Sequence, residues 1–74
     1  MNSYFRKIRG FLRVHVKGYG ATRFVNICSK REIKLWDVEK TEEGFQLSLF
    51  ISDFRKIPEI VRKTKVKVVI VEKH

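Results

Sequence analysis

The chain has 74 residues, of which 17 are Lys or Arg and 8 are Asp or Glu, so its formal net charge is +9. This length allows one small domain with a modest core, and it excludes a second core or a deep, buried active site. The hydrophobic content of 43% is that of a globular domain, the longest apolar run (residues 68–71) is too short to cross a bilayer, and the single cysteine excludes an internal disulfide or a multi-cysteine zinc site.

Residues 1–10 are predicted to form a basic amphipathic leader that precedes the domain. Tyr4 and Ile8 are four residues apart and would share one face of a helical turn among three basic residues. Two interpretations are open: an interfacial anchor on a membrane, or a helical turn that packs on the edge of the domain. The leader lacks the apolar segment of a secretory signal, so we expect a reduced, cytoplasmic setting.

The next two elements are a strand and a helix. Residues 11–17 alternate between apolar and polar side chains, which predicts a half-buried strand that shows Arg13, His15 and Lys17 on its open side. A glycine-rich turn follows it. Apolar residues then recur at helical spacing over residues 21–31, so we predict a helix of about three turns there.

Residues 33–40 are predicted to form a second strand, and the phase of this strand is open. In one arrangement Trp36 and Val38 line the same face. In the other, Ile33 and Leu35 face the helices and Trp36 covers the open side of the sheet.

Residues 41–44 are typical of a hairpin turn, with Gly44 where a positive φ is favoured. Residues 45–51 then alternate clearly, which predicts a third strand. Its odd-numbered residues, through Ile51, are expected to point into the core, and its even-numbered residues, through Phe50, are expected to point outward.

The last part of the chain predicts a second helix and a fourth strand. Ser52 or Asp53 is a good helix N-cap, and apolar residues follow at helical spacing over residues 54–64. Pro58 would interrupt that helix, so we expect an irregular first turn and a regular helix from Pro58 onward. Residues 66–72 are rich in β-branched side chains on both faces, which predicts an interior strand or a covered edge strand.

The order of strand, helix, strand, strand, helix, strand is that of the split β-α-β arrangement. We therefore predict an α+β, ferredoxin-like βαββαβ domain over residues 11–74, with a four-stranded antiparallel sheet and two helices on one face. Right-handed crossovers place the first and third strands in the centre of the sheet. Arg13, His15 and Lys17 would then lie centrally on the open face, with Phe50 nearby.

Basic residues are concentrated in the first 31 positions, which contain no acidic residue and carry a charge of +8, whereas residues 32–74 carry +1. Such asymmetry favours an anionic partner, namely phospholipid head groups, nucleic acid or an acidic protein. The alternative is a solvated basic face with no specific partner. The candidate anionic-surface-binding residues are Arg6, Lys7, Arg9, Arg13, Lys17, Arg23, Lys30 and Arg31.

No catalytic or metal site is predicted. His15 lies on a strand and His74 is the last residue, and the sequence places no carboxylates beside them to complete a metal site. Cys28 is expected to be a buried core thiol, although the bases around it could lower its pKa. Glu42 and Glu43 lie in a turn, where carboxylates are normally solvated. We therefore expect no enzymatic activity and no cofactor.

Two weaker signals concern phosphate and nucleic acid. Gly18-Tyr19-Gly20 before a helix is similar to phosphate-binding turns, but it lacks the lysine-serine pair of a P-loop and the third glycine of a dinucleotide site. An open sheet face can stack RNA bases, but here the third strand offers only Phe50, and the first strand has His15 where a stacking ring is needed. A stand-alone basic nucleic-acid-binding domain remains the alternative function.

The sequence resembles the N-terminal segment of YqfD-family sporulation proteins of endospore-forming Firmicutes. Short matching stretches follow one another along nearly the whole chain, and their order and spacing carry the resemblance. They are Arg9-Gly10, Val14-His15-Val16-Lys17-Gly18, Arg23-Phe24-Val25-Asn26-Ile27-Cys28, Leu35-Trp36-Asp37-Val38, Asp53-Phe54-Arg55-Lys56, Arg62-Lys63-Thr64 and Val71-Glu72-Lys73.

The resemblance implies a membrane protein needed for normal sporulation after engulfment, in which this domain precedes a transmembrane helix. It implies no catalytic residues. A cytoplasmic segment beside a membrane is expected to be rich in Lys and Arg, in agreement with the charge. We therefore expect a non-enzymatic interaction domain at the cytoplasmic face of the membrane in a spore-forming bacterium. It would dock on the membrane surface or on a protein partner of a sporulation assembly, or self-assemble as a homo-oligomer through sheet edges.

Overall fold

A computed structural model of the protein describes residues 10–73, and the leader predicted over residues 1–10 lies almost wholly outside this range. The predicted order of strands and helices is confirmed, with two short helices in place of the predicted second one. The elements are β1 (Phe11–Lys17), α2 (Ala21–Lys30), β2 (Leu35–Lys40), β3 (Gly44–Phe50), α3 (Ile51–Phe54), α4 (Pro58–Thr64) and β4 (Lys67–Lys73).

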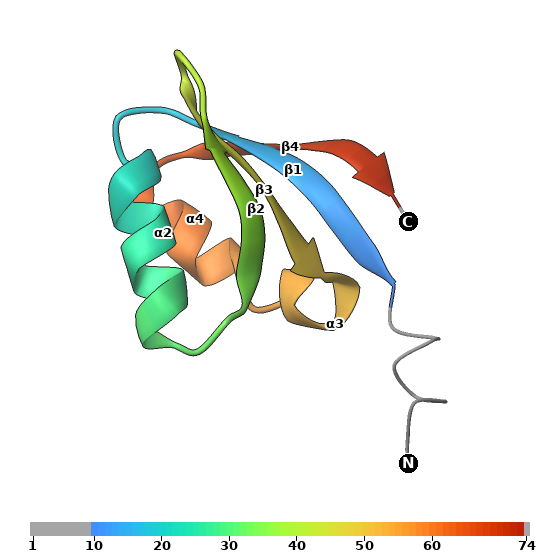
Figure 1. Ribbon diagram of the computed structural model, residues 1–74. Coiled ribbons are helices and arrows are strands. Elements are labelled where there is room, and N and C mark those ends of the chain that lie inside the picture. The colour runs from blue at the N-terminus through green and yellow to red at the C-terminus, as the bar shows by residue number, and fades with distance from the viewer. Residues whose placement is uncertain (1–9, 74) are drawn as a thin grey trace.

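The four strands form one antiparallel sheet in the order β2-β3-β1-β4, so β1 and β3 are central as predicted. Leu12 of β1 pairs with Leu49 of β3, and Val14 pairs with Leu47. Figure 1 shows α2 and α4 on one face of this sheet, and α3 lies at the end of β3. This is the predicted α+β, ferredoxin-like arrangement.

The core lies between the sheet and the helices. It follows from the alternation of β1 and β3, which directs every second side chain toward the helices, and from the helical spacing of the buried residues of α2. The largest side chains that are less than 2% exposed are Phe24, Leu47, Leu49, Ile60, Val14, Val16 and Cys28.

Two glycines are required where the backbone approaches another segment closely. A Cβ atom on Gly20 would collide with the carbonyl oxygen of Thr64, at the end of α4. A Cβ atom on Gly44 would collide with the carbonyl oxygen of Val16, and Gly44 has a φ of +159°, as the hairpin prediction expected. The hairpin turn is further held by the Thr41 hydroxyl, which accepts a hydrogen bond from the Gly44 N–H at 3.0 Å.

The second strand starts later than predicted and has an irregular centre. Glu32 adopts a left-handed φ of 61°, so residue 33 belongs to a loop and β2 begins at Leu35. Asp37 has a φ of 51°, and the pairing register with β3 shifts between Trp36 and Glu39. Of the two predicted arrangements, the second is correct: Leu35 pairs with a core residue of β3, and Trp36 lies on the open face.

The prediction that Ile51 ends β3 with its side chain in the core is wrong. Ile51 begins α3, its side chain is 42% exposed, and its backbone N–H donates a hydrogen bond to the carbonyl oxygen of Gly10 at 3.0 Å. Phe50 is the last residue of β3 and still has an extended backbone, and α3 begins at Ile51, so the alternation that held through the strand no longer applies there.

The N-cap predicted at Ser52 or Asp53 is also wrong. The residues that precede α3 and α4 are Phe50 and Ile57, and neither helix has a side-chain capping bond. The expectation for Pro58 is confirmed, because it occupies the first position of α4, where its missing N–H removes no intrahelical bond. Proline thus separates the second helical region into α3 and α4.

The fourth strand lies at the edge of the sheet. In the described range it pairs with β1 alone, although its sequence predicted an interior or covered position. Val69, Ile70 and Val71 are 37%, 49% and 47% exposed, so apolar side chains are accessible on both faces of this edge.

Candidate anionic-surface-binding face

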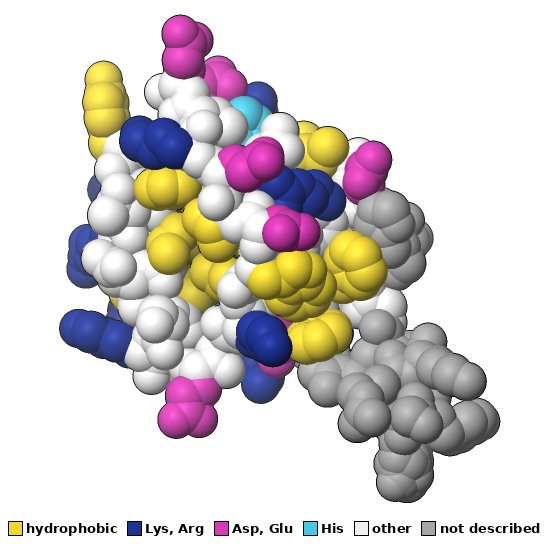
Figure 2. Space-filling model, in the orientation of Figure 1, with side chains coloured by type: hydrophobic (Ala, Val, Ile, Leu, Met, Phe, Trp, Pro, Cys, Tyr) yellow, Lys and Arg dark blue, Asp and Glu magenta, His cyan; other side chains and the backbone are white. Residues whose placement is uncertain are grey.

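The charges of the domain are segregated by structural layer. Residues 20–34 and 51–66, which contain α2, α3 and α4, carry nine basic and three acidic residues, a net charge of +6. Residues 10–19, 35–50 and 67–73, which contain the strands and the hairpin, carry five of each sign. In Figure 2, basic side chains lie along the side formed by α2, and acidic side chains gather at the β2–β3 hairpin. Within residues 10–73, the excess of positive charge therefore belongs to the helical segments.

Two packed helices carry four exposed cations that define what we call the basic helix face: Arg23 and Lys30 of α2, and Arg62 and Lys63 of α4. None of the four forms an ion pair with an acidic residue in the range 10–73. The two helices pack against each other, and these residues lie off the buried sides of both. The four cations thus remain available to an external anion.

An ion pair joins the two helices at one end of this face. Arg31 Nη1 lies 3.1 Å from Glu59 Oε1. The hydrogen bond from Arg31 and then its charge lower the pKa of Glu59, and the charges of Lys63 and Arg62 lower it further. Glu59 is therefore held in its ionised form by the basic residues around it, but one acidic side chain does not neutralise them.

Arg13 is occupied by the sheet. Its guanidinium donates hydrogen bonds to the carbonyl oxygen of Asp37 at 2.7 Å and to the Ser48 hydroxyl at 3.1 Å, and it pairs with the Glu39 carboxylate at 3.1 Å. Its side chain is 15% exposed. This arrangement ties β1 to β3 and to the irregular part of β2, so Arg13 has a structural role on the open face.

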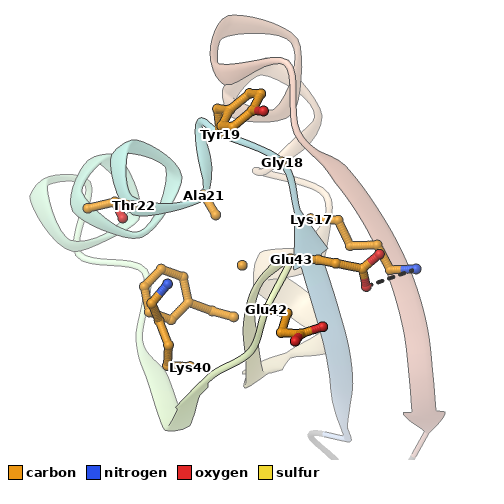
Figure 3. A pocket seen from close by; sticks show the side chains of 10 residues that line it. Lys17, Gly18, Tyr19, Ala21, Thr22, Lys40, Glu42 and Glu43 are labelled. Carbon is orange, nitrogen blue, oxygen red and sulfur yellow. Dashed lines mark ion pairs between the residues drawn. The ribbon is translucent and has the colours of Figure 1, made fainter.

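Lys17 borders a hollow at the end of the sheet, with a volume of about 530 Å³ (Figure 3). Lys17 Nζ lies 3.9 Å from Glu43 Oε1, and both Lys40 and Glu42 also line the hollow. Its lining therefore carries both signs of charge. In the adjoining turn, the backbone of Gly20 lies so close to the end of α4 that no side chain fits there. This packing explains the glycine without a bound phosphate, so the turn is less similar to phosphate-binding loops than its sequence suggests.

The eight predicted residues thus separate into three groups. Arg6, Lys7 and Arg9 lie outside the described residues. Arg13, Lys17 and Arg31 form ion pairs with Glu39, Glu43 and Glu59. Arg23 and Lys30 are exposed on α2 and free of described ion pairs.

Sequence reasoning missed Arg62 and Lys63, because it weighed charge by position in the chain and not by element. The helical spacing of residues in α4 could have predicted that both cations are exposed. Its buried residues are Ile60 and Thr64, and neither cation lies on that side. Placing the charges on the predicted helices would have joined these two cations to those of α2.

The open face of the sheet carries a packed aromatic cluster. The Trp36 ring centroid lies 5.4 Å from that of Phe11 and 4.8 Å from that of Phe50. His15 lies farther along β1, toward the β2–β3 hairpin, and its Nε2 is 2.8 Å from the Thr41 hydroxyl. The three aromatic rings contact one another at one end of the sheet. They do not form a row of separate stacking platforms along the central strands.

Cys28 is a buried core thiol, as predicted. Its side chain is inaccessible, and burial raises its pKa to about 11, although the charge of Arg31 acts in the opposite direction. The described part of the chain contains no group of three or more His, Cys, Asp or Glu residues arranged to hold a metal ion. None of the helices in residues 10–73 is both long and apolar enough to span a membrane.

A comparison with models of protein families gives a match over most of the chain. The model of the family described as "Putative stage IV sporulation protein YqfD" matches residues 6–74, which include every element of the fold. No curated protein and no solved structure matches the chain.

Proposed function

The chain belongs to the YqfD family of sporulation proteins, and on this premise we propose that the domain is a non-enzymatic module that docks on an anionic membrane surface. The basic helix face is the contact. We place it at the cytoplasmic face of a membrane in a spore-forming bacterium, where the lipid surface is negatively charged.

The observation that carries the proposal is the segregation of charge. The helical segments carry +6, whereas the strands and hairpin are neutral overall. A surface with one sign of charge attracts a flat anionic layer without needing a pocket. Arg23, Lys30, Arg62 and Lys63 extend from the two packed helices and supply this attraction.

The strength of this attraction is sufficient for reversible docking. Each Lys or Arg near an anionic bilayer contributes about 1 kcal/mol. Four such residues contribute roughly 4 kcal/mol, which corresponds to about a thousandfold in affinity. The attraction is screened beyond about 8 Å at physiological salt, so only side chains close to the lipid contribute fully.

The sheet face favours a lipid surface over single-stranded RNA. Modules that bind RNA through a sheet stack bases on separate aromatic rings. Here Phe11, Trp36 and Phe50 pack on each other, and the Arg13 guanidinium is held by Glu39 and Ser48. Within residues 10–73, the open face thus offers few groups to an RNA base.

The test is co-sedimentation of the purified 74-residue protein with neutral and with anionic liposomes at physiological salt. Duplex DNA and single-stranded RNA are added in parallel as competitors. We expect binding to anionic vesicles that persists in the presence of either nucleic acid. Binding that nucleic acid abolishes would replace the proposal with the nucleic-acid alternative, and no vesicle binding would point to a protein partner.

A further inference from the structure

The outer edge of β4 has the properties of a strand that pairs with another chain. The strand is seven residues long, and no strand within residues 10–73 pairs with its outer side. Val69, Ile70 and Val71 are between 37% and 49% exposed. Edge strands in monomeric proteins are usually protected by charge, proline or a covering segment, and a long apolar edge invites pairing.

A bulge gives this edge a symmetric arrangement of charges. Opposite β1, Lys67 pairs with Lys17, Val69 with His15 and Glu72 with Arg13. The register shifts between Arg13 and Val14, so β4 has one extra residue in this interval. Lys67 and Glu72 therefore lie on the open face together with Val69. Each of the two pairs with a β1 residue that is two positions from His15, the partner of Val69, although Lys67 is two residues and Glu72 three residues from Val69 in sequence.

We propose that a second copy of this chain pairs with β4 in antiparallel orientation about a twofold axis at Val69. On the open face, this register sets Val69 opposite Val69 and sets Lys67 of each copy opposite Glu72 of the other. On the opposite face, Val68 meets Ile70. Opposite charges thus meet twice and apolar side chains meet between them, whereas parallel pairing in register would place like charges side by side.

The proposed pair forms a continuous eight-stranded sheet with both helix layers on the same side. An antiparallel pair of strands keeps the two faces of the sheet in common, because directly opposite residues point to the same side. The basic helix faces of the two copies would then point in one direction. This last consequence rests on the proposed membrane docking, since two linked contacts bind a surface more tightly than one. The pairing itself does not depend on it.

The charge arrangement permits a test by exchange of partners. Lys67→Glu sets Glu against Glu across the twofold axis, and Glu72→Lys sets Lys against Lys. Each variant alone is expected to raise the dimer dissociation constant about tenfold or more in sedimentation equilibrium. An equal mixture of the two variants restores both opposite-charge pairs and is expected to recover the dimer. Circular dichroism verifies that each variant is folded.

A cysteine at the twofold axis tests the register. Cβ atoms of residues directly opposite in an antiparallel pair are close enough for a disulfide in favourable geometry. Val69→Cys is expected to yield a covalent dimer under mild oxidation, and Val38→Cys, an exposed valine on the opposite edge strand, serves as the matched control. The native Cys28 is buried and does not compete.

Three results would overturn the proposal. The first is a wild-type protein that remains a monomer of 8.8 kDa at all accessible concentrations. The second is a mixture of the two charge variants that stays monomeric while the wild type dimerises. The third is equal cross-linking of the cysteines at positions 69 and 38. All these measurements are made without lipid, so their failure is distinct from failure of membrane docking.

Discussion

The Arg31 guanidinium lies 3.1 Å from the Glu59 carboxylate and joins the end of α2 to the beginning of α4. The pair brings together two segments that are 28 residues apart in sequence. It connects the two helices that carry the basic helix face, with Arg23 and Lys30 on one and Arg62 and Lys63 on the other. The ion pair is thus part of the surface on which the proposed function depends.

The lowered pKa of Glu59 predicts how this ion pair responds to pH. Because the pKa is lower in the folded than in the unfolded state, the pair stabilises the fold above the ordinary glutamate pKa, and this contribution is lost as the pH falls through the lowered value. An NMR titration is expected to show the lowered pKa of Glu59, and Arg31→Met is expected to raise this pKa toward the ordinary value of a glutamate side chain. An unchanged pKa in Arg31→Met would show that Arg31 is not its main cause.

Removing the negative charge of Glu59 is expected to strengthen membrane binding. Glu59→Gln removes one negative charge, which raises the net charge of the helical segments by one, and it should raise the affinity for anionic vesicles by roughly twofold to fivefold. Glu42→Gln gives the same net charge, but at the β2–β3 hairpin, and is expected to change the affinity less than about twofold. Equal effects of the two variants would mean that net charge, and not the basic helix face, determines binding.

Arg13 and Arg23 are expected to give opposite results although both are basic. Arg13→Met removes hydrogen bonds to Asp37 and Ser48 and is expected to lower the free energy of unfolding by about 1–3 kcal/mol, with little change in vesicle affinity. Arg23→Met is expected to leave stability within about 0.5 kcal/mol and to weaken vesicle binding about fivefold. Urea unfolding and co-sedimentation measure the two quantities, and a large loss of vesicle binding in Arg13→Met would contradict the assignment.

The turn before α2 is expected to tolerate no side chain at Gly20. A Cβ atom there would collide with the carbonyl oxygen of Thr64, so Gly20→Ala must shift α2 or α4. We expect a loss of about 1–3 kcal/mol in the free energy of unfolding, as for other overpacked sites. Thr22→Ala, at an exposed position of α2, is the control and should stay within about 0.5 kcal/mol. A neutral Gly20→Ala would show that the contact relaxes easily.

The fold could be predicted wherever local pattern and tertiary environment agree. The alternation of β1 and the position of Pro58 at the start of α4 followed directly from the residues. The facing of Trp36 could not be decided, because Asp37 adopts a left-handed conformation that interrupts the alternation. Ile51 was misplaced for a related reason. The alternation of apolar and polar residues continues through Ile51, but the strand ends one residue before it.

The candidate site was less accessible to prediction than the fold. The distribution of charge along the sequence suggested that the N-terminal half forms the basic surface. In the structure, Arg13 and Lys17 of that half lie on the sheet in ion pairs, whereas Arg62 of the C-terminal half belongs to the basic helix face. Which cations are neutralised depends on pairs such as Arg13 with Glu39, 26 residues apart. Such pairs depend on the register in which the strands align. The sequence pattern does not specify this register where a strand is irregular, as β2 is.

The most direct test of the central claim compares two double variants with equal charge. Arg23→Gln with Lys30→Gln neutralises half of the basic helix face, and Lys17→Gln with Lys40→Gln removes the same charge near the hairpin. In co-sedimentation with anionic vesicles, we predict about thirtyfold weaker binding for the first and less than about threefold for the second. Equal losses in both, or no loss in the first, would contradict docking through the basic helix face.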